Sequence, residues 1–160
     1  MAVDEYEFLP RPDTKPHCNI PNLKVKLAGM NEPVVAIFDG GAEACFISYA
    51  LYMAMDPASR PTLRTSTMDV RGAFGTSSHS PIGEVTLTVS IPELRLAVAF
   101  DFVVDEHITE SLLLDNSFMV YAKINNHYAD NKLVRGSQRV DAFSRVSQVQ
   151  ACRRITLRED

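Results

Sequence analysis

The chain lacks the residues that mark several classes of protein. It has no tryptophan, only three cysteines among 160 residues, and no apolar run of the roughly 20 residues that a membrane helix needs. Cys18, Cys45 and Cys152 are far apart and lack the spacing of zinc ligands, so we expect neither a disulfide framework nor a metal site. The acidic segment 1–7 has neither the basic nor the apolar region of a secretory signal. We therefore expect an intracellular, cytoplasmic protein without a cofactor or a membrane partner.

An excess of basic charge is also missing from most of the chain. Residues 1–134 hold ten Lys and Arg against 17 Asp and Glu, whereas residues 135–160 hold six Arg against three acidic residues. A nucleic-acid-binding domain typically carries a basic face. We therefore expect no nucleic acid on the body of the protein, while contact between the C-terminal arm and phosphates stays open.

Composition divides the chain into three parts. Residues 1–21 are acidic and contain four prolines, which predicts an extended leader or linker. Residues 22–135 contain short apolar runs, many of them alternating, separated by turn residues, which predicts an all-β barrel or sandwich. Residues 136–160 form a basic C-terminal arm, which we expect to contact a partner or a second copy.

Local patterns predict individual elements. Alternating or continuous apolar runs rich in β-branched residues indicate strands, and runs of good helix formers indicate short helices. The expected strands are 23–27, 34–38, 62–73, 84–91, 94–105, 123–124 and 132–134. The expected short helices are 49–55 and 115–122, and in the arm we expect a helix over 137–150 and a strand over 151–157.

One carboxylate stands at the end of a predicted buried strand. Residues 34–38 are apolar and lead directly into Asp39, and Gly40 and Gly41 then allow the backbone to turn. A carboxylate at the mouth of a buried strand is costly unless another group satisfies it or a reaction uses it. Asp-Gly is also an ordinary turn signal, so this pattern alone leaves a structural turn and a catalytic acid both open.

Four motifs, in this order, resemble the retropepsin-like aspartic proteases of retroviruses, LTR retrotransposons and their cellular derivatives. The resemblance covers residues 22–135. It rests on an apolar strand with an Asp-Gly-Gly-Ala loop, an apolar run before a short helix, a glycine-bounded hairpin at the place of the family's flap, and two apolar runs before a second short helix. The motifs are Val35–Ala42, Cys45–Ser48, Gly72–Gly83, and Phe102–Asp105 with Leu112–Phe118. The resemblance implies an all-β, retropepsin-like closed barrel of short strands with a flap hairpin and one or two short helices.

The resemblance also implies a mechanism. Aspartic proteases need two carboxylates that share one proton, and this chain matches the family at one aspartate, Asp39. The second carboxylate would come from Asp39 of another copy, which implies a homodimer that binds an extended peptide or protein segment. The active-site loop would be Gly40, Gly41 and Ala42. The flap, which contacts the peptide, would include Gly72, Ala73, Phe74, Gly75, Thr76 and Ser77.

Two positions depart from the family's pattern. Gly40 stands where the family has Thr or Ser, whose hydroxyl bonds across the dimer and stiffens the loop. Leu114 stands where the family usually has glycine, and we expect its side chain to crowd the Asp39 turn unless the loop runs differently. The two departures favour a protease of weakened or lost activity, kept as a dimerisation or peptide-binding module. An active endopeptidase and an interaction domain of a nucleic-acid-related protein are the alternatives.

Other polar residues have structural interpretations. Asp115 precedes a short helical pattern and is predicted to cap that helix. Asp101 and Asp105, on a predicted strand, are expected to face solvent, and Cys45 is expected to be a small core residue. The four histidines are predicted to lie on the surface or in loops: His17, His79, His107 and His127.

Overall fold

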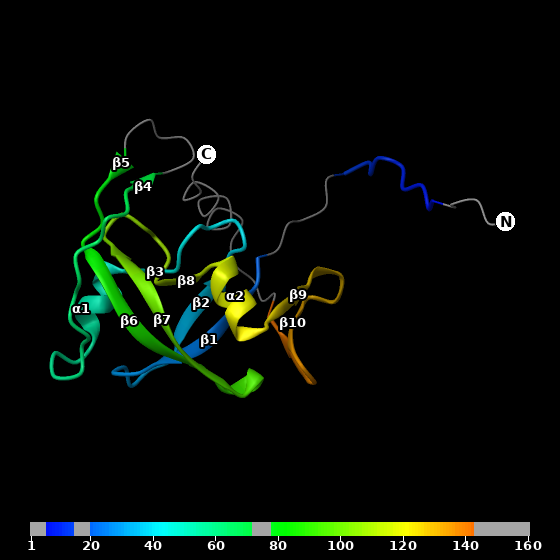
Figure 1. Ribbon diagram of the computed structural model, residues 1–160. Helices are drawn as coiled ribbons and strands as arrows, with labels where there is room; N and C mark the ends of the chain where they lie inside the picture. The colour runs from blue at the N-terminus through cyan, green and yellow to red at the C-terminus, as the bar shows by residue number, and fades with distance from the viewer. Residues whose placement is uncertain (1–5, 15–19, 72–77, 143–160) are drawn as a thin grey trace.

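The computed structural model describes residues 6–14, 20–71 and 78–142 (Figure 1). Six strands close into a barrel in the order β1-β2-β8-β3-β7-β6. They are β1 (Asn22–Leu27), β2 (Val34–Phe38), β3 (Phe46–Ser48), β6 (Gly83–Ile91), β7 (Leu96–Asp105) and β8 (Leu112–Leu114). The closed all-β barrel expected from the sequence is therefore confirmed.

Shorter elements surround the barrel. In Figure 1 the β4–β5 pair lies above the barrel, and the β9–β10 hairpin lies to the right of helix α2. The helices are α1 (Tyr49–Ala54) and α2 (Asn116–Ala122), with 3₁₀ turns η1 (Pro92–Leu94) and η2 (Tyr128–Asp130). The remaining strands are β4 (Val70–Arg71), β5 (Ser78–His79), β9 (Asn125–His127), β10 (Lys132–Arg135) and β11 (Gln138–Asp141).

The alternating pattern of β6 places its apolar residues inside the barrel. Val85, Leu87 and Val89 are buried, whereas the intervening threonines are exposed. β6 pairs antiparallel with β7 over nine residue pairs, and β1 closes the barrel against the other edge of β6. Burial of each such side chain stabilises the fold by about 1.5–3 kcal/mol. Phe38 and Phe118 complete this core from β2 and α2.

Strand pairing brings the ends of β2 and β8 together. β2 runs parallel to β8 with Phe38 opposite Leu114, and β8 runs antiparallel to β3. Asp39 and Asp115 follow directly after the paired ends. The start of α2 therefore lies beside the loop that carries Asp39.

Three predicted elements differ from the structure. The strand predicted over 123–124 is wrong, because Lys123 caps α2 in the left-handed region and the strand begins only at Asn125. Within 62–71, only a bridge from Arg64 to Glu84 and the two residues of β4 have strand pairing, so the long strand predicted over 62–73 is wrong in its described part. Residues 65–69 have no partner strand among the described residues, and a Ser66 side-chain bond to Met68 forms a local turn. The helix predicted from residue 137 is also wrong at its start, because β11 pairs with β10 there.

Several predictions fall outside the described residues. These are the flap tip from Gly72 to Ser77 and the C-terminal arm beyond residue 142. Residues 6–14 form neither helix nor strand and are exposed. Across the described ranges, no helix is long and apolar enough to cross a membrane.

Candidate active site

Asp39 is held by backbone hydrogen bonds at the end of β2. Its N–H donates to the carbonyl oxygen of Leu114 at 2.8 Å, which ties the loop to β8. Its Oδ1 accepts the N–H of Gly41 at 2.9 Å, and its carbonyl oxygen accepts the N–H of Ala42 at 3.2 Å. The residue is half-buried. The carboxylate is thus oriented by its own loop and still reachable from outside.

Of the two outcomes expected for Leu114, crowding of the Asp39 turn does not occur. Its side chain is fully buried in the main core together with Phe38 and Phe118. Its carbonyl oxygen is the acceptor for the Asp39 N–H. The bulky residue therefore fills the barrel interior, and its backbone supports the loop.

Gly40 has room for a side chain. A Cβ added there would lie 3.9 Å from Asn116 Oδ1 and 4.0 Å from the terminal methyl of Met119, which are ordinary contact distances. The φ angle of Gly40 is not in the left-handed region. The loop geometry therefore does not itself require glycine at this position.

A buried cluster fixes the start of α2 beneath the loop. Asp115 caps the helix by accepting the N–H of Phe118 at 2.9 Å, as predicted, and also accepts from Ser117 Oγ at 2.7 Å. Cys45 Sγ lies 3.2 Å from the same Oδ1, and the Asp115 N–H donates to this sulfur at 3.3 Å. Burial raises the pKa of the Cys45 thiol, and the charge of Asp115 raises it further. Cys45 is therefore a neutral core residue, as expected, and it links the segment after the Asp39 loop to α2.

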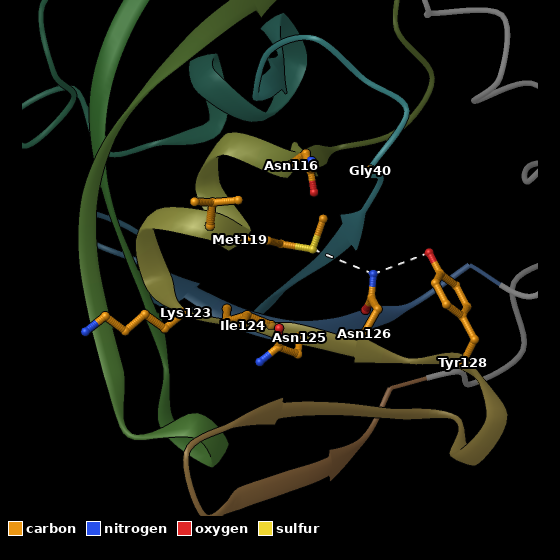
Figure 2. A pocket seen from close by; sticks show the side chains of 9 residues that line it. Gly40, Asn116, Met119, Lys123, Ile124, Asn125, Asn126 and Tyr128 are labelled. Atoms are coloured by element: carbon orange, nitrogen blue, oxygen red, sulfur yellow. Dashed lines mark hydrogen bonds between the residues drawn. The ribbon is translucent and has the colours of Figure 1, made fainter. Parts of the chain in front are cut away.

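A pocket of about 540 Å³ opens beside Gly40 (Figure 2). Asn126 Nδ2 lies 3.7 Å from Met119 Sδ and 3.4 Å from the Tyr128 hydroxyl, so one amide joins α2 to the end of β9. Asn126 Oδ1 is buried and has no hydrogen-bond partner within the described part of the chain. The pocket is lined by Gly40, Asn116, Met119, Val120, Lys123, Ile124, Asn125, Asn126 and Tyr128.

The base of the β4–β5 pair packs against the Asp39 loop. Val70 is 3% exposed and belongs to a second apolar cluster that contains Ala42, Phe46 and Leu113. Its neighbours in the chain, together with Glu43 and Ala44, line a smaller pocket of about 140 Å³. The glycine-bounded hairpin expected as a flap thus has its base over Ala42, while its six predicted contact residues lie outside the described ranges.

Asp105 is the main error in the sequence interpretation of polar residues. Asp101 is exposed as predicted, but Asp105 is completely buried, and its Oδ1 lies 2.7 Å from Nε2 of His79. His79 is accordingly a half-buried strand residue with a partner. Val103, an apolar residue on the same face of β7 as Asp101 and Asp105, was the available signal that this end of the strand is covered.

No group of three His, Cys, Asp or Glu side chains within the described ranges has the geometry of a metal site. Of the predicted active-site residues, the structure brings together Asp39, Gly40, Gly41 and Ala42 in one turn. The pocket beside Gly40 and the His79–Asp105 contact were not found from the sequence.

No family model and no curated protein sequence matches this chain. Among solved structures, the retroviral protease-like domain of Ddi1 from Leishmania major matches 79% of this chain and 95% of its own length, with a TM-score of 0.60 and 16% identity. The chain has a retropepsin-like fold. A protein of unknown function from Legionella pneumophila, Lpg0085, matches 62% of this chain and 83% of its own length, at 13% identity. Its TM-score of 0.38 is too low to support an argument.

The match to the Ddi1 domain bears on the fold, because an identity of 16% does not establish a shared activity. In this retropepsin-like barrel, the Asp39 loop, α2 and the β4–β5 pair are neighbours. These are the parts from which a function can be argued.

Proposed function

We propose that this chain is one subunit of a homodimeric aspartic-protease-type domain that binds an extended peptide and whose peptidase activity is weakened or lost. The observation that carries the proposal is the Asp39 loop, a half-buried carboxylate held by backbone bonds at the end of a strand in a retropepsin-like barrel.

The need for two carboxylates supports the dimer. In aspartic protease chemistry one carboxyl group donates a proton to the scissile carbonyl while the other accepts a proton from water. Asp39 alone supplies one of these groups. A second copy related by a two-fold axis would supply the other through the same surface.

The surface next to Gly40 is suitable for such a contact. β9 is the last strand of the sheet β11-β10-β9, and its outer edge pairs with no described strand. Val120 and Tyr128, which line the adjoining pocket, are 72% and 59% exposed. An unpaired strand edge next to apolar side chains is a ready site for a second chain. A partner's donor in this pocket would also satisfy the buried Oδ1 of Asn126.

The nearness of the β4–β5 pair to the Asp39 loop supports the peptide-binding part of the proposal. Val70 at the base of this pair belongs to the same apolar cluster as Ala42 of the loop. An extended peptide between them would pair its backbone with neighbouring chain, as in other cases of strand addition.

Gly40 supports the proposed weakening of activity. A Thr or Ser hydroxyl at this position would add a hydrogen bond and restrict the loop, and glycine supplies neither. Small displacements of catalytic groups cost large factors in rate. A fully active endopeptidase is the second candidate, and the observation in its favour is that Leu114 supports the Asp39 backbone.

The test combines light scattering with a peptide-library cleavage assay between pH 4 and pH 7. We expect the wild-type protein to be a dimer with weak or undetectable cleavage, and Gly40→Thr to increase cleavage because the added side chain has space. Asp39→Asn should abolish any cleavage. Asp56→Asn, at an exposed turn, is the matched control and should change neither property.

The outcomes separate the candidates. Strong cleavage by wild type that equals cleavage by Gly40→Thr would favour the active peptidase. A monomer at high protein concentration would contradict both candidates, because a single Asp39 then has no partner.

A further inference from the structure

A buried carboxylate and a histidine meet where β5 reaches the barrel. Asp105, the last residue of β7, has no exposed surface, and its Oδ1 lies 2.7 Å from Nε2 of His79. Its other oxygen, Oδ2, is buried without a hydrogen-bond partner in the described part of the chain. An ionised carboxylate in such a place is costly unless its one contact is strong. A ring N–H that donates to an ionised carboxylate makes that contact a charge-assisted hydrogen bond.

The other charged groups around this contact point elsewhere. The His107 ring packs edge-on against the His79 ring with 4.3 Å between centroids, and His107 Nε2 lies 3.7 Å from Glu106. The β4 segment contributes Val70 opposite His79, while its charged residue Arg71 is exposed. β3 places an uncharged serine opposite Asp105. Asp105 is therefore the carboxylate that His79 contacts.

The β4–β5 ladder is too short to hold itself in place. It consists of two residue pairs, and isolated two-stranded hairpins are marginal in water. Val70 attaches β4 to the barrel through the apolar cluster over Ala42. On β5 the corresponding attachment is the contact from His79 to Asp105.

We infer that His79 and Asp105 are positioning residues that fasten β5 to the end of β7 and thereby fix the β4–β5 pair over the Asp39 loop. The attachment rests on the 2.7 Å contact between His79 Nε2 and the buried Oδ1 of Asp105. The consequence for peptide binding rests on the proposed function, whereas the attachment itself does not.

Hydrogen exchange measured by mass spectrometry tests the attachment. The reporter is segment 78–83, where the Ile82 N–H donates to the Val104 carbonyl oxygen, and segment 22–38 in the β1–β2 hairpin is the internal reference. At pH 6 we expect His79→Gln to speed exchange in 78–83 about tenfold relative to wild type, because a bond to a charged group is lost.

Two further variants complete the design. Asp105→Asn should speed exchange in the reporter to a similar degree, and the double variant should add nothing further, because both changes remove one contact. His107→Gln is the matched control, since it removes a neighbouring imidazole that does not contact Asp105, and should leave the reporter unchanged. Equal acceleration in 78–83 and 22–38, an unchanged reporter, or additive effects in the double variant would overturn the inference.

The experiment does not depend on catalysis. If the protein proved monomeric and bound no peptide, the exchange ratios would still decide whether His79 fastens β5. If the protein binds peptide as proposed, His79→Gln should weaken that affinity.

Discussion

Replacing Asp115 by alanine tests how the start of α2 is held beneath the Asp39 loop. The side chain is 3% exposed and accepts from the Phe118 N–H, the Ser117 hydroxyl and the Cys45 thiol. Alanine removes all three acceptor contacts and leaves the first N–H groups of the helix without a cap.

The expected loss can be worked out contact by contact. Removal of an N-cap costs about 1 kcal/mol. A buried donor left without its acceptor costs about 1–3 kcal/mol, and the Cys45 thiol, a weak donor, belongs at the low end. Ser117 is exposed and can bond to water, so it adds little. We therefore expect Asp115→Ala to lower the free energy of unfolding by about 2–3 kcal/mol.

Urea unfolding followed by far-UV circular dichroism, at one fixed protein concentration, measures this loss. Asp115→Asn keeps the capping oxygen and should lose about 1 kcal/mol or less. Asp56→Ala is the matched control, because it removes a single bond to the Ala58 N–H at an exposed turn, and should change stability by about 0.5 kcal/mol at most. If Asp115→Ala cost no more than Asp56→Ala, the reasoning about the buried cluster would be refuted.

Two further predictions follow from the structure. Burial raises the pKa of the Cys45 thiol above its ordinary value of 9.0, so above pH 9 the unfolded chain loses this proton while the folded chain keeps it. The stability that this thiol contributes is therefore complete below pH 9 and declines above it. Between pH 9 and pH 10 the wild-type protein should therefore lose about 1 kcal/mol more than Cys45→Ser in urea unfolding, and parallel pH profiles would contradict this. Gly83→Ala should cost about 1–3 kcal/mol, since the added Cβ would lie 2.6 Å from the Arg64 carbonyl oxygen. Gly40→Ala, where the added Cβ lies at ordinary contact distances, should cost less than about 0.5 kcal/mol. Equal losses of stability in the two variants would refute the packing argument.

Local patterns predicted the parts of the fold that depend on neighbouring residues. The alternation in β6, the β1–β2 hairpin and the cap at Asp115 all follow from residue type and spacing, and the structure has all three. The strand predicted over 62–73 failed because β-branched residues do not reveal whether a partner strand is available. Among the described residues of this segment, only Arg64 pairs its backbone with β6 before the chain turns at Ser66.

The errors at the site have one cause, which is dependence on contacts distant in sequence. The direction of the Leu114 side chain is set by the pairing of β8 with β2. In this pairing Leu114 lies opposite Phe38, which comes 76 residues earlier in the chain. The burial of Asp105 depends on His79 from another hairpin. The position of Asp39 at the end of a buried strand was predictable, but the role proposed for it requires a second copy, which a single chain does not contain.

The central claim is that two copies of the chain bring their Asp39 residues together. Asp39→Cys, in a background with Cys18→Ser and Cys152→Ser, tests it directly. Carboxylates that share a proton lie about 3 Å apart, so thiols placed at these two positions lie close to each other. Buried Cys45 can stay, and Met53→Cys in the same background is the control at an exposed position of α1.

The measurement is the fraction of disulfide-linked dimer after mild oxidation, read on a non-reducing gel. The account predicts that Asp39→Cys becomes largely cross-linked at concentrations where Met53→Cys remains mostly uncross-linked. Cross-linking of Asp39→Cys that does not exceed the Met53→Cys control would contradict the account.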